Sequence, residues 1–106
     1  MSDIAKLGHT LTVIDQAALS VILEPQSEER RAALCALIRE HGPVMAEEYS
    51  LGDIEIWRKK ILGIAGEIVA TATARQGGWD RGHLGLIVSY IRTMRGFIAK
   101  VLAALP

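Results

Sequence analysis

The side chains best suited to acid–base or metal chemistry in this 106-residue chain are three histidines and one cysteine. They are His9, His41, His83 and Cys35. A di-iron-type site in a helical bundle needs Glu-x-x-His pairs, because that spacing projects two ligands from successive turns, and the sequence has no such pair. Asp80 and His83 have this spacing, but the aspartate is better explained as a helix cap. We therefore expect neither a metal nor a cofactor.

The sequence also lacks a pattern for nucleophilic catalysis. Cys35 lies between Leu34 and Ala36-Leu37-Ile38, which predicts a buried and inert thiol. No His-Glu-x-x-His motif, phosphate loop, glycine fingerprint or Ser/His/Asp arrangement is present. No histidine is followed by the lysine and glycine that a phosphotransfer histidine would have one turn on. The chain is therefore predicted not to be an enzyme.

Apolar residues recur every three or four positions along most of the chain, as they do on one face of a helix. The longest stripe runs between Trp79 and Pro106 and consists of Leu84, Ile87, Ile91, Met94, Ile98, Val101 and Leu105. The sequence predicts an all-α fold, with residues 1–106 as a single domain that forms a small antiparallel bundle of three to four helices. Because a domain of this size buries proportionally little surface, we expect dimerisation to complete it. The pattern does not decide whether the last stripe meets other helices of the chain or a second subunit.

Prolines and capping residues set the predicted ends of the first two helices. Ser2 or Asp3 can cap the first helix, and Pro25 ends it, because the residue before a proline is driven out of the helical region. Ser27 is the predicted cap of the second helix. Gly42-Pro43 is the strongest break in the sequence and is predicted to end this helix.

The start of the third helix is less determined. Pro43 suits the first position of a further helical turn through Tyr49, and the sequence leaves open whether the segment 43–49 is separate from the helix at 50–76. Ser50 and Asp53 have the spacing of a capping box that would open the third helix. Trp57 follows on the apolar stripe of this helix and is predicted to lie in the core.

Glycines within the last two predicted helices need an explanation, because each costs about 1 kcal/mol relative to alanine. They are Gly63, Gly66, Gly85 and Gly96. The run Gln76-Gly77-Gly78 ends the third helix and Asp80 can cap the fourth, so the two should form an antiparallel hairpin. We predict that close packing within this hairpin offsets the cost of the glycines. Trp79, at the turn, is predicted to be either a helix staple or a partly exposed anchor.

Charge is zero overall but is segregated along the chain. Residues 1–53 hold four basic and nine acidic side chains, whereas residues 54–106 hold eight basic and three acidic ones. The two halves should attract each other, within one chain or between two. Zero net charge argues against direct nucleic-acid binding. No leader-like N-terminus and no long apolar window are present, so we expect a cytoplasmic protein with no membrane segment.

Short runs of the sequence resemble TraM-like quorum-sensing antiactivators of conjugal plasmids. Residues Gly96-Phe97-Ile98-Ala99-Lys100-Val101 are similar to the Gly-Phe-Ile-Pro-Lys-Val run that closes the family, with alanine in place of its proline. Leu37-Ile38-Arg39-Glu40-His41 is similar to an Ile-Arg-Thr-His stretch, and Leu23-Glu24-Pro25 lies where the family has a Leu-Pro-Pro turn. The resemblance covers residues 23–106.

The resemblance implies a small helical homodimer that binds a LuxR-type transcription activator and keeps it from its promoter DNA, with no catalysis and no cofactor. The predicted partner-binding residues are Ile91, Arg92, Met94, Arg95, Phe97, Ile98, Lys100 and Val101. Their apolar members would bury against the activator, and the basic ones would pair with acidic groups at the rim. Two alternatives remain: a self-assembling helical accessory or immunity-type protein, and a small ligand- or metal-binding bundle.

Overall fold

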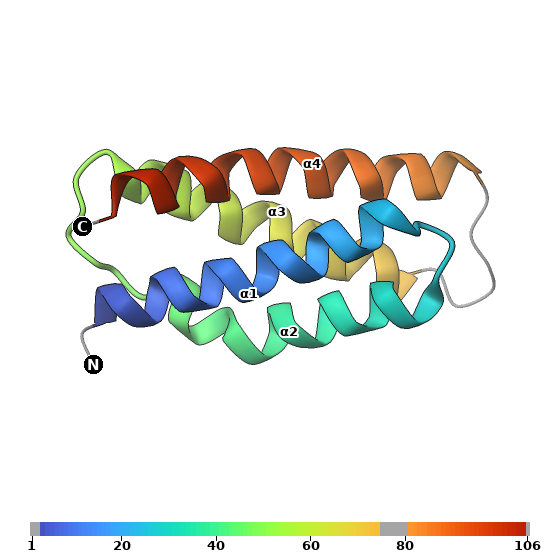
Figure 1. Ribbon diagram of the computed structural model, residues 1–106, viewed down its shortest axis with the longest axis horizontal. Helices are drawn as coiled ribbons and strands as arrows, with labels where there is room; N and C mark the ends of the chain where they lie inside the picture. Colours follow the sequence, from blue (N-terminus) through green and yellow to red (C-terminus); the bar gives the residue numbers. More distant parts are fainter. Residues whose placement is uncertain (1–2, 75–80, 106) are drawn as a thin grey trace.

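Four helices of the computed structural model form an antiparallel bundle, as Figure 1 shows. The structure describes residues 3–74 and 81–105. The helices are α1 (Asp3–Leu23), α2 (Glu28–Ala46), α3 (Ile54–Ala74) and α4 (Arg81–Ala104). Helix α1 packs against α2 and α4, and α3 packs against the same two helices. The predicted all-α bundle is therefore confirmed, with four helices in the described part of the chain.

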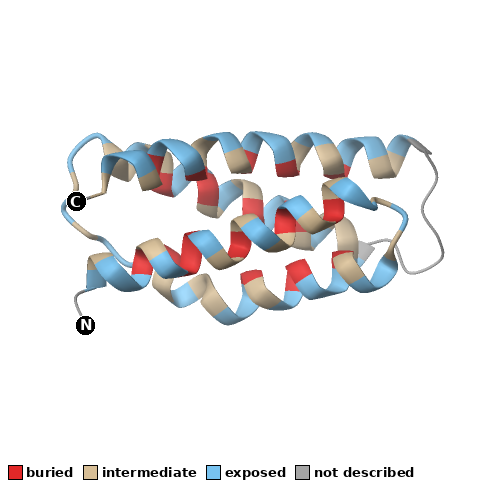
Figure 2. Ribbon diagram, in the orientation of Figure 1, coloured by how far each residue is buried: buried red, intermediate tan, exposed pale blue. Residues whose placement is uncertain are grey.

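The core is built from the inward-facing stripes of all four helices (Figure 2). Its fully enclosed members include Leu7, Leu11, Ile14, Ala18 and Val21 of α1, and Ile87, Ile91, Met94, Ile98 and Val101 of α4. Cys35 is buried beside Leu34 and Ile38, as predicted. Because the inner stripe of α4 is covered by this chain's own helices, it is part of the monomer's core.

The connection between α1 and α2 has the predicted helix-ending proline and helix-capping serine. Helix α1 ends at Leu23, two residues before Pro25. The Ser27 hydroxyl accepts a hydrogen bond of 3.2 Å from the backbone N–H of Arg30, which satisfies one of the free donors at the start of α2. The turn is also held by Arg30, whose Nη1 donates to the Ser20 carbonyl at 2.9 Å.

Helix α2 continues through Gly42-Pro43, so the predicted break at this point is wrong. Pro43 lies inside the helix, which ends at Ala46. A proline inside a helix lacks one backbone hydrogen bond and crowds the turn before it, so the short helical turn after Pro43 needs a compensating contact. Burial of Met45, which is 1% exposed, gives that turn a reason to stay helical.

Residues 47–53 form a non-helical connection, and the predicted capping box at Ser50 and Asp53 does not open α3. Ser50 has φ 51° and Gly52 has φ 63°, both in the left-handed region. This region is unfavourable for a non-glycine residue at a helix start, and α3 begins only at Ile54. The segment 43–49 is thus divided between the end of α2 and this connection.

The helix glycines do not lie between α3 and α4, so the predicted close packing of the hairpin is wrong. Gly63, Gly66, Gly85 and Gly96 are exposed, and a Cβ atom added to any of them would meet nothing within 4 Å. Larger side chains form the α3–α4 interface instead. The other predictions for this hairpin concern the turn Gln76-Gly77-Gly78, Trp79 and the Asp80 cap, which lie outside the described residues, as does the predicted cap Ser2.

Candidate protein-binding surface

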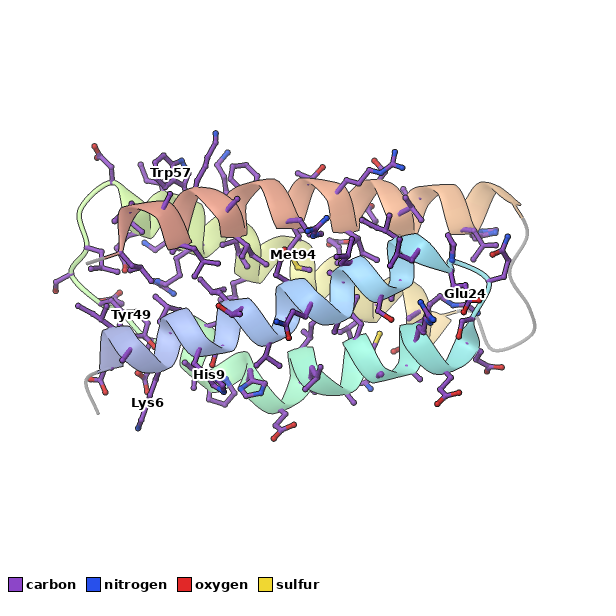
Figure 3. The ribbon with its side chains drawn as sticks, viewed as in Figure 1. Lys6, His9, Glu24, Tyr49, Trp57 and Met94 are labelled. Carbon is purple, nitrogen blue, oxygen red and sulfur yellow. The ribbon has the colours of Figure 1, made fainter. Side chains whose placement is uncertain are left out.

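The structure divides the eight predicted partner-binding residues between the core and the surface. Ile91, Met94, Ile98 and Val101 are each 0% exposed, and in Figure 3 Met94 lies between α4 and α1. In the folded bundle these four cannot touch a partner. The predicted surface is corrected accordingly: Arg92 and Lys100 are exposed, and Arg95 and Phe97 are half-buried.

Arg95 is engaged within the chain. Its Nε donates to Oδ1 of Asp15 at 2.9 Å, and its Nη2 lies 3.4 Å from Oδ2. Both side chains are about one-third exposed, at 32% and 29%. The pair joins α4 to α1 and is an instance of the predicted attraction between the basic and acidic halves. Arg95 therefore has a structural partner already, and Arg92 and Lys100 are the predicted cations that remain exposed.

Phe97 and Lys100 meet two residues of α3 that the sequence did not single out as binding groups. Lys60 Nζ lies 5.4 Å from the centroid of the Phe97 ring, and Lys100 Nζ lies 5.6 Å from it. Lys100 Nζ is also 5.7 Å from the Trp57 ring. We call Trp57, Lys60, Phe97 and Lys100 the lysine–aromatic cluster.

The register of two antiparallel helices places the cluster on the outer seam between α3 and α4. Trp57 and Lys60 are three residues apart, as are Phe97 and Lys100, so each pair projects from one face of its helix. Figure 3 shows Trp57 on the α3–α4 side of the bundle, away from α1 and α2. The tryptophan packs against the core but is half-buried, so its predicted place in the core is confirmed only in part. Both rings are thus partly open to solvent beneath exposed ammonium groups.

The cluster lies on a basic side of the molecule. Its two lysines have no carboxylate within ion-pair distance among the described residues. Lys59 and Arg92 are further exposed cations of α3 and α4. Described side chains of α4 include no carboxylate, and those of α3 include only Glu55 and Glu67. A lysine held over a ring retains N–H donors that point to solvent, so this seam can bind an anionic group.

A buried polar network fixes the start of α3 next to the cluster. Arg58 is 2% exposed; its Nε donates to Glu55 Oε2 at 2.9 Å and its Nη1 to the Met45 carbonyl at 2.6 Å. Glu55 Oε1 accepts from the backbone N–H of Tyr49 at 3.2 Å, and the Tyr49 hydroxyl donates to the Val44 carbonyl at 2.6 Å. The network ties α2, the connection and α3 together one turn from the cluster.

The electrostatics of the network follow from its contacts. The hydrogen bond from Arg58 holds the pKa of Glu55 below its usual value, because the charged carboxylate is the better acceptor. Burial, with the neighbouring Glu47 carboxylate, raises the pKa of Tyr49 to about 12. At neutral pH, Glu55 is therefore a carboxylate that accepts hydrogen bonds, and Tyr49 is a neutral phenol that donates one.

The described residues offer no clear alternative site. Within residues 3–74 and 81–105, no three His, Cys, Asp or Glu side chains are grouped so that they could hold a metal ion. His41 lies 3.4 Å from the Thr10 hydroxyl, inside α2 rather than at the predicted helix end. Burial raises the pKa of the Cys35 thiol, which disfavours its nucleophilic form. None of the described helices has the length and apolar character needed to span a membrane.

Comparison of the chain with protein-family models, curated proteins and solved structures gives no match. The candidate surface therefore rests on its own geometry.

Proposed function

We propose that this chain is a non-enzymatic regulatory protein that sequesters a LuxR-type quorum-sensing transcription activator and so prevents its DNA binding. The observation that carries a binding function is the lysine–aromatic cluster, in which two exposed cations lie over half-buried rings and form no ion pair with a carboxylate of residues 3–74 or 81–105. The choice of partner comes from the TraM-like runs of the sequence. Arg92 is a further exposed cation of α4.

The mechanism is occupation of a surface. The inner faces of α3 and α4 are fixed in the core, so their outer faces are presented to a partner without rearrangement, which lowers the entropic cost of binding. Phe97 and Trp57 supply aromatic anchors, and Lys60 and Lys100 supply charge that orients the encounter. An activator held at this seam would be unable to contact promoter DNA with the same surface.

The direct test mixes this purified protein with ligand-loaded LuxR-type activators encoded in the same genome. We expect a hetero-complex by size-exclusion chromatography with light scattering, and loss of the activator's shift of promoter DNA in a gel assay. Activators that elute unchanged and retain full DNA binding would show the proposal to be wrong.

Self-assembly is a second candidate, and the charge distribution favours it. Exposed acidic residues lie on α1 and α2, including Asp3, Glu28, Glu29 and Glu40, whereas three of the four exposed lysines, Lys59, Lys60 and Lys100, lie on α3 and α4. A contact between unlike faces of two copies would be heterologous and would build rings or filaments. A homodimer remains part of the proposal, but its interface must use outer faces, because the α4 stripe is in the core.

A further inference from the structure

We propose that the lysine–aromatic cluster binds an acidic amphipathic helix of a partner protein, whose carboxylate sits between Lys60 and Lys100 above the Phe97 ring. This inference rests on the proposed function only in taking the ligand to be a protein. Both ammonium groups lie within 5.6 Å of the centroid of one ring. Two ammonium groups next to one ring make the local potential positive, so the arrangement favours an anionic ligand.

The backbone beside the cluster has room for a helix. Gly63 is one turn from Lys60, and Gly96 is one turn from Lys100. Both glycines are exposed, with open space where a Cβ atom would be. Packing within this chain therefore gives no reason for glycine at either position, although each lowers helix stability. A second helix lying along the seam would give one, since glycine lets two backbones approach closely.

Exposed apolar groups on the two helices suit the apolar side of such a helix. Ile56, four residues before Lys60, is 56% exposed, and Leu86 of α4 is 42% exposed. Phe97 and Trp57 are half-buried. An amphipathic helix has apolar and acidic residues on adjoining faces, so one ligand can contact these groups and the lysines together.

Charge argues for a protein ligand over a nucleic acid. The chain as a whole has no net charge, and α1 and α2 carry exposed carboxylates that would repel a long polyanion. Nucleic-acid sites neutralise many phosphates with an extended basic face, whereas this cluster offers two cations around one ring. It matches one or two carboxylates in size.

The probe is a synthetic acidic amphipathic peptide of roughly 18 residues, about 27 Å of helix, with leucines on one face and glutamates on the adjoining face. A peptide with glutamine in place of every glutamate is the matched neutral ligand, and a short DNA duplex is the polyanion. Each is titrated into the full-length 15N-labelled protein. We expect the acidic peptide alone to shift the amide signals of Lys60, Phe97 and Lys100.

Removing both charges with Lys60→Gln and Lys100→Gln should weaken peptide binding about tenfold. The matched control removes two exposed cations elsewhere, with Lys6→Gln and Arg39→Gln, and should change affinity less than about twofold. Gly63→Ala with Gly96→Ala should raise the unfolding temperature and still weaken binding, because the added methyl groups fill the space for the ligand. Circular dichroism confirms that every variant is folded.

Three results would overturn the inference: equal binding of the neutral peptide, unchanged affinity in the double lysine variant, or tighter binding of the DNA duplex at the same residues. The two proposals fail separately. If an activator complex forms and survives loss of both lysines, sequestration stands and the cluster is the wrong surface. If the acidic peptide binds but no activator does, the cluster is a site for acidic helices and the LuxR-type partner is wrong.

Discussion

Arg58 shows how one buried charge can organise a junction between helices. It serves Glu55 and the Met45 carbonyl at once while lying 5.9 Å from the Tyr49 ring. We expect Arg58→Met to lower the free energy of unfolding by about 3 kcal/mol, because it leaves a carboxylate and a carbonyl without their donor. Urea denaturation measures the change. Arg39→Met, at an exposed position, should stay within about 0.5 kcal/mol of wild type, and a similar loss there would remove the special role of Arg58.

Glu55 makes the same junction sensitive to acid. Its pKa is held below the ordinary 4.5 in the folded protein, so its contribution to stability is present above that value and is lost as the pH falls through the folded pKa. We expect the unfolding temperature of wild type to fall more steeply between neutral pH and pH values below 4.5 than that of Glu55→Gln. Parallel pH profiles for the two proteins would contradict this.

Individual residues were predictable from sequence where one local pattern decided their place. Cys35 was correctly expected in the core, because apolar residues surround it along the chain. Arg58 and Glu55 gave no comparable signal, since the Met45 carbonyl and the Tyr49 N–H lie 13 and six residues away from them. Trp57 was predicted correctly only in part. Its ring packs against the core, but it is half-buried and lies beneath the Lys100 ammonium group at the surface.

At the scale of helices, replacing two of the glycines with alanine is predicted to change the free energy of unfolding in opposite directions. Gly85 of α4 has open space around a would-be Cβ, so Gly85→Ala should raise the free energy of unfolding by about 0.5–1 kcal/mol. Gly52 has equal space but a φ of 63°, so Gly52→Ala should lower it by about 1 kcal/mol. Chemical denaturation of the two variants provides the comparison, and a loss of stability in Gly85→Ala would show that the glycine is needed for folding.

The periodicity of apolar residues was enough to predict that the helices form. Where each helix ends depended also on tertiary contacts, which the periodicity does not reveal. The Pro25–Ser27 turn was predicted correctly, because both signals act on their immediate neighbours. The end of α2 was not, since burial of Met45 keeps a turn helical beyond Pro43. Helix α3 begins at Ile54, and not at the predicted Ser50, because Ser50 and Gly52 in the connection adopt left-handed backbone conformations.

For the whole molecule, segregated charge predicts salt-sensitive association. Unlike faces on α1–α2 and α3–α4 attract at low ionic strength, and salt screens this attraction. We expect the weight-average mass from light scattering to exceed that of a monomer in dilute buffer and to fall as sodium chloride is added. An increase of mass with salt would instead indicate an apolar interface, and a constant dimer mass would favour a closed homodimer.

The sequence could not decide what covers the last stripe, because its heptad would suit a neighbouring helix of the chain and a second subunit equally well. The structure covers it with the chain's own helices, and half of the predicted binding residues thereby become core residues. Prediction of the site failed in part for the same reason. Lys60 and Trp57 join Phe97 and Lys100 only once α3 and α4 have a definite register.

The packing of α1 against α4 also affects when the bundle can close during synthesis of the chain. The first helix ends at Leu23 and the helix that covers it begins at Arg81, so most of the chain must be synthesised between the two. Until α4 leaves the ribosome, the apolar stripe of α1, from Leu7 to Val21, lacks one of its two neighbours. The apolar stripe of α1 is thus open to chaperones and proteases until α4 emerges, and closure of the bundle by α4 is expected to be the committing step of folding.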